Sequence, residues 1–340
     1  MNGNVLKAPK IIITTGAEAS IPPIKGFDRV PYLTSTSAFE LEELPESLII
    51  IGGGVIGCEV GQMFARMGTE VTILCRSHLL PKEEPEISQA LETYLKEDGV
   101  KVICGAVYQS IKEDNGICLC YDHEGKTHHL MADHVLAATG RKANSSGMGL
   151  EELGIKLAPN GGIVVDQHLQ TSLPGIYASG DVTGRDQYVY MAAYGGKVAA
   201  YNALNGNSLT YDNSAMPGIV FTDPQVATVG LTEKNARKQG FAVKTSLLSL
   251  DHVPRALVAR DTRGLIKLVA DKQTDKLLGA HILAPEGADS IQTAVLAIKQ
   301  GLTVKDMAEM IYPYLTTVEG LKLAALAFDK NVEALSCCAG

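Results

Sequence analysis

Short apolar runs alternate with glycine turns and helical patterns over roughly the first 212 residues of the chain. The clearest series is an apolar run at Ser47–Ile51, a glycine loop, a helical stretch at Val55–Met67 and a second apolar run at Glu70–Leu74. A strand, a helix and a strand in this order predict a βαβ unit within an α/β fold. Further strands are predicted at Val100–Cys104, Ile117–Tyr121 and His134–Ala138, with a hairpin turn at Glu124-Gly125-Lys126 between the last two.

The pattern changes near Met216. From there, strand-like runs stand beside two helical stretches, which predicts an α+β domain of about 125 residues. The strands are expected at Gly218–Phe221, Val243–Ser249, Leu265–Ala270 and Leu277–Leu283, and the helices near Ala288–Lys299 and Val318–Phe328.

One sequence pattern occurs twice. Ile11–Gly16 and Val135–Gly140 are both apolar runs that end in Thr-Gly. The second run closes a domain whose glycine loop begins at Gly52, 88 residues before Gly140. An equivalent loop for the first run needs a similar distance, but only 15 residues precede Gly16. We therefore expect that most of a first dinucleotide-binding domain lies outside this sequence.

Composition and charge narrow the class of protein. Hydrophobic residues make up 46% and charged residues 20% of the chain, which is typical of a globular protein. The net charge of −8 argues against nucleic acid as a partner, and no apolar run is long enough to span a membrane. Five cysteines lie in apolar segments, as expected for buried thiols of a cytoplasmic protein. They are Cys58, Cys75, Cys104, Cys118 and Cys120.

The glycine loop at residues 52–57 matches the G-x-G-x-x-G pattern of dinucleotide-binding sites and stands in the required place between a strand and a helix. Gly52 would permit the tight turn, Gly54 the close approach of a pyrophosphate, and Gly57 the packing of helix against strand. A plain structural turn is the alternative.

The residue after the second strand indicates which dinucleotide binds. An NAD site usually has an acid at this position, where the chain has Cys75 followed by Arg76. Arg76 could pair with a 2′-phosphate, so the sequence favours NADPH over NADH. A solvated surface charge is the alternative interpretation of Arg76.

A Gly-Asp pair follows the predicted strand Gly175–Ala178. A carboxylate at the C-terminal end of a strand, here Asp181, can accept hydrogen bonds from the hydroxyl groups of a sugar-like ligand. An ordinary Gly-Asp turn explains the same residues equally well.

The order of these elements resembles the pyridine nucleotide–disulfide oxidoreductases over essentially the whole chain. The resemblance implies a flavoprotein that binds FAD and NADPH. It implies that Thr15, Gly16 and Asp181 contact FAD, that Gly140 contacts NADPH, and that Glu59 lies beside the nicotinamide. The matching segments are Thr14–Ala17, Gly52–Gly57 with Glu59, Ala138–Asn144 and Ala178–Val182.

Within that family, the C-terminal region is similar to the mercuric reductases, which reduce Hg(II) to Hg(0). Thiol-directed members carry a histidine base five residues before a glutamate, whereas here Tyr314 stands five residues before Glu319. The resemblance implies catalytic roles for Tyr32, Tyr314 and Glu319 in an active site shared between the subunits of a homodimer. The matching segments are Thr222–Gly230, Val253–Ala256, Tyr312–Gly320 and Leu335–Gly340.

Cys337 and Cys338 are adjacent and nearly terminal. Two thiolates select soft metal ions, so this pair would bind the substrate Hg(II) and pass it inward by ligand exchange. Two alternatives stay open, namely incidental cysteines near a chain end and a Cys-Cys-Ala-Gly prenylation box.

Four segments are predicted on this basis. Residues 1–35 are the C-terminal edge of a truncated FAD-binding domain, and residues 36–141 are the NADPH-binding domain. Residues 142–212 return to the FAD-binding domain, and residues 213–340 form the dimerisation domain with its Cys-Cys tail.

The chain contains no Cys-x4-Cys pair, which the family uses to carry electrons from FAD. Three functions therefore remain possible. The first is an NADPH-dependent Hg(II) reductase, and the second is a catalytically incomplete dimer that binds NADPH and Hg(II). The third is an enzyme like dihydrolipoamide dehydrogenase, against which Tyr314 argues.

Overall fold

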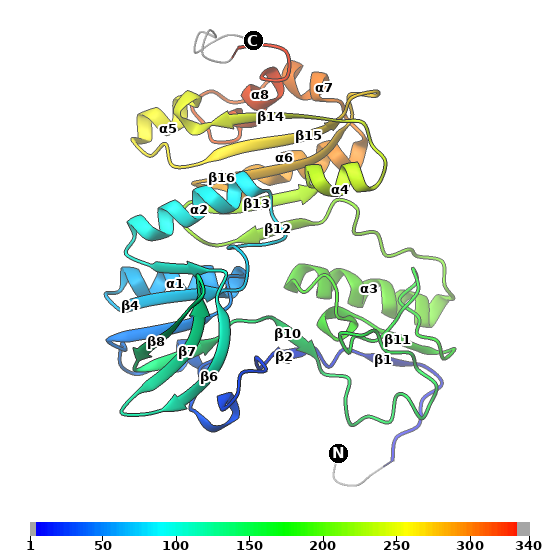
Figure 1. Ribbon diagram of the computed structural model, residues 1–340. Helices are drawn as coiled ribbons and strands as arrows, with labels where there is room; N and C mark the ends of the chain where they lie inside the picture. Colours follow the sequence, from blue (N-terminus) through cyan, green and yellow to red (C-terminus); the bar gives the residue numbers. More distant parts are fainter. Residues whose placement is uncertain (1–4, 332–340) are drawn as a thin grey trace. The chain divides into compact units, whose positions relative to one another are not determined.

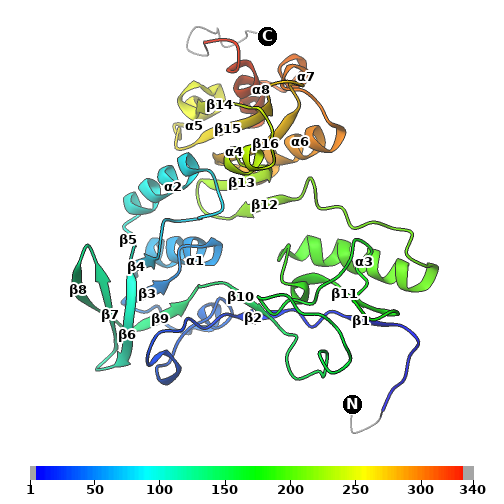
Figure 2. The ribbon, with the colours of Figure 1, turned by 45° about the vertical axis from the view of Figure 1, so that its right-hand side comes forward.

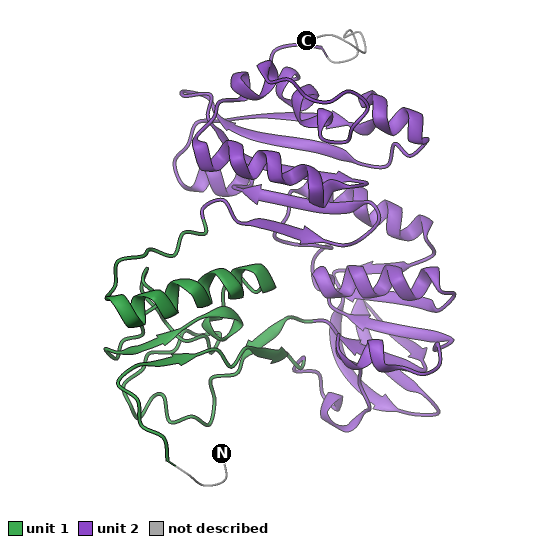
Figure 3. Ribbon diagram, turned by 180° about the vertical axis from the view of Figure 1, so that it is seen from behind, with its two compact units in different colours: residues 1–21, 139–213 green, residues 22–138, 214–340 purple. Residues whose placement is uncertain are grey.

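The computed structural model describes residues 5–331 (Figure 1). The chain forms two compact units, each built from two segments (Figure 3). The first unit contains residues 1–21 and 139–213, and the second contains residues 22–138 and 214–340. The boundaries of the four sequence segments given above remain predictions.

A parallel four-stranded sheet lies at the centre of one half of the second unit. The strand order is β5-β4-β3-β9, with β3 at Ser47–Ile51, β4 at Glu70–Cys75, β5 at Lys101–Cys104 and β9 at His134–Ala137. Two helices, α1 at Val55–Arg66 and α2 at Pro85–Glu97, pack on one face. In β3, Leu48 and Ile50 face these helices while Ile49 and Ile51 face the opposite side, and all four are at most 1% exposed. Such near-continuous apolar runs are typical of a parallel sheet covered on both faces.

A three-stranded antiparallel sheet covers the other face. Its strands are β6 at Val107–Glu113, β7 at Ile117–His123 and β8 at Lys126–Ala132. The predicted hairpin turn exists, with Glu124 and Gly125 both at positive φ. The prediction was wrong about what the turn connects, because it joins β7 to β8 and not to β9. Only one face of β8 is covered, so the strand contains many polar residues. Its sequence therefore lacks the apolar run from which the other strands were predicted.

The C-terminal half of the second unit is an antiparallel sheet with helices on one face. The strand order is β12-β13-β16-β15-β14, with β12 at Pro217–Val220, β13 at Gln225–Gly230, β14 at Val243–Ser249, β15 at Leu265–Asp271 and β16 at Leu277–Ala284. The helices that bury its apolar face are α6 at Gly287–Gln300, α7 at Val304–Glu309 and α8 at Glu319–Leu326. The shorter helices α4 and α5 span Glu233–Lys238 and Pro254–Ala259. The predicted α+β pattern is thus confirmed, although β13 was not predicted.

The two halves of the second unit share an apolar core. Val226 of β13 and Leu283 of β16 belong to the same buried cluster as Phe64 of α1 and Leu91 of α2. Figures 1 and 2 show α2 running alongside the five-stranded sheet. The dinucleotide-binding half is therefore packed directly against the C-terminal sheet.

The first unit is smaller and has short strands. A parallel pair is formed by β1 at Ile11–Ile13 and β11 at Ile176–Ala178, and an antiparallel pair by β2 at Ala17–Ala19 and β10 at Arg141–Ala143. The helix α3 at Val189–Asn205 packs on this unit through Val198 and Ala199, which contact the buried Tyr177. Both strands of the parallel pair lead into segments that the family resemblance singled out.

A buried lysine ties the two halves of the second unit together. Lys267 Nζ on β15 lies 2.9 Å from Glu84, 2.8 Å from Glu86 and 3.2 Å from Glu233. The Lys267 and Glu84 side chains are only 4% and 3% exposed. Burial by itself would lower the pKa of Lys267, but its hydrogen bonds to Glu86 and Glu84 outweigh burial and raise that pKa. The lysine is therefore held in its charged form.

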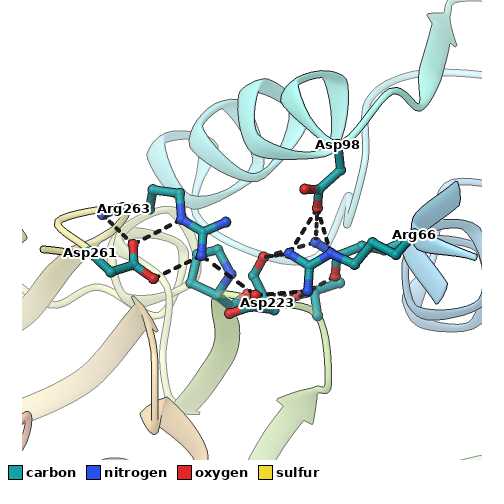
Figure 4. Close-up of polar contacts among 8 residues, drawn as sticks. Arg66, Asp98, Asp223, Asp261 and Arg263 are labelled. Carbon is teal, nitrogen blue, oxygen red and sulfur yellow. Dashed lines mark hydrogen bonds and ion pairs between the residues drawn. The ribbon is translucent and has the colours of Figure 1, made fainter. Parts of the chain in front are cut away.

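A more exposed ion-pair network lies along the same junction (Figure 4). Arg66 of α1 lies 2.8 Å from Asp223 and 3.0 Å from Asp98, and Arg263 lies 2.8 Å from Asp261 and 3.5 Å from Asp223. The hydrogen bond from Arg263 holds the pKa of Asp261 below its ordinary value. Because these side chains are 20% to 50% exposed, each pair contributes at most about 1 kcal/mol, and the network mainly fixes geometry.

Among the described residues, no helix has both the length and the apolar character needed to cross a membrane.

Replacement of the buried lysine should destabilise the chain strongly. Lys267→Met leaves Glu84 buried without its cation, so the free energy of unfolding should fall by roughly 3–5 kcal/mol. Urea denaturation measures this loss. The matched control is Lys112→Met, which removes an exposed lysine paired with Asp114 and should leave the free energy of unfolding unchanged within error. Equal losses of unfolding free energy in the two variants would show that the buried Lys267 contributes no more to stability than an exposed lysine.

Candidate functional site

The glycine loop between β3 and α1 has a backbone that needs glycine at two positions. Gly52 adopts φ 120°, which strains other residues, and its N–H donates to Leu74 O at 2.9 Å. A Cβ atom at Gly57 would lie 2.0 Å from Gly52 O, so only glycine lets α1 approach the loop this closely. At Gly54, the N-cap of α1, a Cβ would meet nothing within 4 Å. Open space therefore lies at the N-terminus of a twelve-residue helix, where anions are stabilised.

The residues that follow β4 have no carboxylate at the position that an NAD ribose would use. Cys75 ends the strand and is 4% exposed, and Arg76 after it is exposed. Tyr108 donates its hydroxyl to Leu74 O at 2.8 Å, and burial keeps its pKa far above the ordinary value. A cationic side chain thus stands at the end of β4 beside a neutral phenol.

Glu59 lies within the first two turns of α1, and its carboxylate is already engaged. Its Oε1 atom accepts a hydrogen bond from the backbone N–H of Phe221 at 2.6 Å. Burial raises the pKa of Glu59, although the bond from Phe221 opposes this shift. No sequence pattern predicted this contact, which joins residues 162 positions apart.

The segments predicted to contact FAD meet at one edge of the first unit. The strands β1 and β11 are parallel neighbours, and Ser179 N–H donates to Ile13 O at 3.1 Å just beyond their paired residues. Thr15 and Gly16 follow β1, and Asp181 follows β11. Ligands of α/β proteins bind at the C-terminal ends of parallel strands, so this placement suits a cofactor contact.

Polar contacts connect these segments to the Thr-Gly motif that follows β9. The Thr15 hydroxyl donates to Asn144 O at 2.7 Å, and Asn144 N–H donates to Gly16 O at 2.9 Å. Arg141 lies 3.4 Å from the Asp181 carboxylate and also donates to Ala17 O. The Arg141–Asp181 pair was not predicted, although both residues stand in motifs quoted from the sequence.

Two further observations bear on the fit of a ligand at this edge. The Ser179 hydroxyl is buried and has no hydrogen-bond partner among the described residues. Gly16 adopts φ 72°, and a Cβ there would meet nothing within 4 Å. The open space at Gly16 suits a ligand group at this edge, whereas the Ser179 hydroxyl lies against α3, where a Cβ on Gly195 would be 2.5 Å from it.

Gly140 belongs to the first unit, whereas Gly52, Gly54, Gly57 and Arg76 belong to the second. Gly140 adopts φ 114°, and its carbonyl accepts a hydrogen bond from Ser20 N–H at 2.9 Å. The residues predicted to bind NADPH are thus divided between the two units.

Tyr314 and Glu319 lie at the start of α8 in the second unit. Tyr314 is 54% exposed in the loop between α7 and α8. Glu319 is the first residue of α8, and its Oε2 atom is buried with no hydrogen-bond partner among the described residues. The Tyr312 hydroxyl is also buried without a hydrogen-bond partner among the described residues, and burial raises the pKa of Tyr312 to about 12. Buried oxygen atoms without a partner are rare in native proteins, so these two need a structural or functional explanation.

Tyr32 lies in a different part of the second unit. Its ring centroid is 5.2 Å from that of the buried Phe27, and the side chain is 37% exposed. Cys337 and Cys338 lie outside the described residues. Among residues 5–331, no group of three or more His, Cys, Asp or Glu side chains is arranged to hold a metal ion.

Comparison with known proteins identifies the family. The model of the pyridine nucleotide-disulphide oxidoreductases matches residues 1–202, and the model of their dimerisation domain matches residues 216–325. Mercuric reductases from Bacillus cereus and Staphylococcus aureus are each 48% identical to the chain over its whole length, which spans 54% and 62% of theirs. The mercuric reductase of Streptomyces lividans is 46% identical over 98% of the chain and 71% of its own length.

Solved structures agree with this assignment. The Cu(II) complex of the HOCl-induced flavoprotein disulfide reductase RclA from Escherichia coli has a TM-score of 0.85 at 32% identity, over 94% of this chain and 72% of that one. LpdA from Mycobacterium tuberculosis has a TM-score of 0.82 at 28% identity, over 93% of this chain and 69% of its own. The chain therefore belongs to the pyridine nucleotide-disulphide oxidoreductase family, in which its sequence groups with the mercuric reductases.

Proposed function

We propose that this chain provides the NADPH-binding, dimerisation and metal-handling parts of a flavoenzyme that reduces Hg(II) to Hg(0). The observation that carries the proposal is the pair Tyr314 and Glu319. A phenol replaces the imidazole base of thiol-directed relatives, and five residues later Glu319 carries a buried carboxylate oxygen that lacks a partner among the described residues. This arrangement removes the base that dithiol substrates require and leaves oxygen ligands for a metal ion.

The chain's own residues would bind the nicotinamide cofactor in the following way. Gly52 and Gly54 leave the backbone N–H groups at the N-terminus of α1 open to the pyrophosphate, and Gly57 holds that helix close. Arg76 would pair with the 2′-phosphate, which makes NADPH the preferred dinucleotide. The family resemblance gives Gly140 a contact to NADPH as well. Glu59, whose pKa is raised by burial, would lie beside the nicotinamide.

Thr15, Gly16 and Asp181 would hold FAD at the strand ends of the first unit. Asp181 would accept hydrogen bonds from the hydroxyls of the flavin side chain, and Arg141, 3.4 Å away, would orient that carboxylate. When bound, FAD would supply the electron carrier between NADPH and the final electron acceptor.

The substrate Hg(II) would be bound first by Cys337 and Cys338, whose thiolates favour soft metal ions. Tyr32, Tyr314 and Glu319 would then surround the ion at the site of reduction. Because Tyr32 belongs to a different part of the unit from Tyr314, we propose that a homodimer brings them together across its interface. The dimerisation domain carries exposed apolar residues that suit such an interface, at Leu257, Val258, Leu296 and Ile311.

A second candidate function follows from the absence of a Cys-x4-Cys pair in the chain. Without that pair, the chain would be a dimer that binds NADPH and Hg(II) through thiols but does not turn over. Dihydrolipoamide dehydrogenase-like activity is disfavoured, because Tyr314 occupies the place of its histidine base.

Two measurements on the purified chain distinguish these functions, namely its flavin colour and its oxidation of NADPH. A yellow protein that oxidises NADPH only when Hg(II) is added would support the reductase. A colourless protein that binds NADPH without Hg(II)-dependent oxidation would support the binding dimer. Oxidation driven by lipoamide and not by Hg(II) would overturn both.

Arg76 should decide the choice of dinucleotide. Arg76→Glu replaces a phosphate-binding cation by a repelling carboxylate, so NADPH affinity should fall about tenfold to hundredfold while NADH affinity changes little. Fluorescence titration with each dinucleotide measures the ratio. The control Lys82→Glu makes the same charge change six residues further on and should affect the two dinucleotides equally. Equal losses for NADPH and NADH in Arg76→Glu would show that Arg76 does not read the phosphate.

Dimer formation should depend on the exposed apolar residues of the C-terminal half. Ile311 is 100% exposed in the single chain. Ile311→Asp places a charge in the proposed interface and should convert the dimer to a monomer at micromolar concentration. Light scattering after size-exclusion chromatography gives the mass. Leu44→Asp changes a residue that is 53% exposed elsewhere in the unit and should remain dimeric.

A further inference from the structure

Two cysteines lie side by side at the end of the parallel sheet. Cys75 ends β4, Cys104 ends β5, and the two are direct partners in the register of that strand pair. Their Sγ atoms are 3.3 Å apart. The function proposed above uses neither thiol, although the pair adjoins the dinucleotide loop.

The pair is accessible from one side. Cys104 is partly exposed, whereas Cys75 is 4% exposed. The Glu92 carboxylate of α2 lies 3.7 Å from Cys104 Sγ, so an approaching cation would meet a negative charge. Burial raises the pKa of both thiols, which makes them poor nucleophiles toward common oxidants at neutral pH.

The geometry suits a two-coordinate metal ion. Neighbouring strands lie about 4.7–4.9 Å apart. Two metal–thiolate bonds of about 2.3 Å each, the value for zinc, span about 4.6 Å when they lie in line, so the two Sγ atoms, 3.3 Å apart, would separate by about 1.3 Å through side-chain rotation when an ion enters.

From this geometry we propose that Cys75 and Cys104 form a binding site for a soft thiophilic metal ion, separate from the Cys337–Cys338 pair. When Hg(II) binds, the two S–H bonds break, two sulfur–metal bonds form and two protons pass to solvent. No oxidation state changes, so no other reactant is required. Soft ions displace protons from thiols because the sulfur–metal bond outweighs the S–H bond.

Metal binding at this pair would disturb the dinucleotide loop. A Cβ built on Gly53 would lie 3.0 Å from Cys75 Cβ and 3.3 Å from its Sγ, so Cys75 already packs against the loop backbone. Gly53 O also accepts the N–H of Leu80 at 2.7 Å, which holds the loop to the segment after β4. Rotation of the Cys75 side chain toward a bridging ion would therefore shift Gly53 and weaken NADPH binding. By reciprocity, bound NADPH would weaken metal binding equally.

This consequence for NADPH rests on the proposed nucleotide site, whereas the metal site itself does not. The site would make excess Hg(II) an inhibitor that acts at the dinucleotide loop and not at the substrate tail.

The first test measures how much Hg(II) the full-length chain retains. Protein is mixed with mercuric chloride, desalted in the presence of free cysteine to strip single-thiol adducts, and analysed for metal. Cys104→Ser and Cys75→Ala should each retain one Hg(II) per chain fewer than the unsubstituted protein. Cys120→Ser, which removes another partly exposed thiol, should retain as much as the unsubstituted protein.

A tail variant separates this site from the proposed function. Cys337→Ser/Cys338→Ser should also lose one Hg(II), and adding Cys104→Ser should remove a second. If the tail variant loses none while Cys104→Ser still loses one, the tail proposal fails and the new site stands. Equal retention by Cys104→Ser and the unsubstituted protein would overturn the new site.

The second test measures the coupling. Preloading the tail variant with Hg(II) should weaken NADPH binding about tenfold, and Cys104→Ser in the same background should abolish this effect. Unchanged NADPH affinity after metal is shown to be bound would overturn the inhibitory role.

Discussion

The close approach of α1 to the sheet beneath it is the constraint on which most of the second unit depends. A Cβ at Gly57 would clash with backbone, which excludes a larger residue there, and a Cβ at Gly61 would lie 2.9 Å from the end of the Ile73 side chain, which would have to shift. The two glycines lie one turn apart and let the helix backbone rest directly on β3 and β4. Because interiors are close-packed, the helix has little freedom to shift once it is seated.

The opposite face of α1 carries the C-terminal sheet. Glu59, Gln62 and Arg66 are spaced three and four residues apart and share one side of the helix. They bind Phe221 N–H at 2.6 Å, the backbone of Asp223 at 2.8 Å and its carboxylate at 2.8 Å. One helix therefore presents its N-terminus to the space at Gly54 and fixes the β12–β13 loop. A displacement of the glycine loop would therefore also move the five-stranded sheet, which belongs to the dimerisation domain.

Local pattern predicted those elements that are buried on both faces or strongly periodic. The bounds of β3 and β14 came directly from the sequence, and the unbroken apolar run of β3 is a strong strand signal. The strands β6, β8 and β13 were missed, because strands that mix polar and apolar residues resemble loops. At the site, strand ends and glycines were predictable from their motifs. The Arg141–Asp181 and Glu59–Phe221 contacts were not, since they depend on how distant segments pack.

The strands described in the first unit are shorter than β3 and β4 of the second unit. Its parallel sheet has two strands, and Ile11 and Ile12 of β1 are 47% and 37% exposed. Strands with exposed side chains open locally at a lower cost in free energy than a buried strand such as β3. Amide hydrogens of β1 and β11 would then exchange with solvent through local opening. A ligand held at Asp181 would slow that exchange, because binding only to the closed form stabilises it.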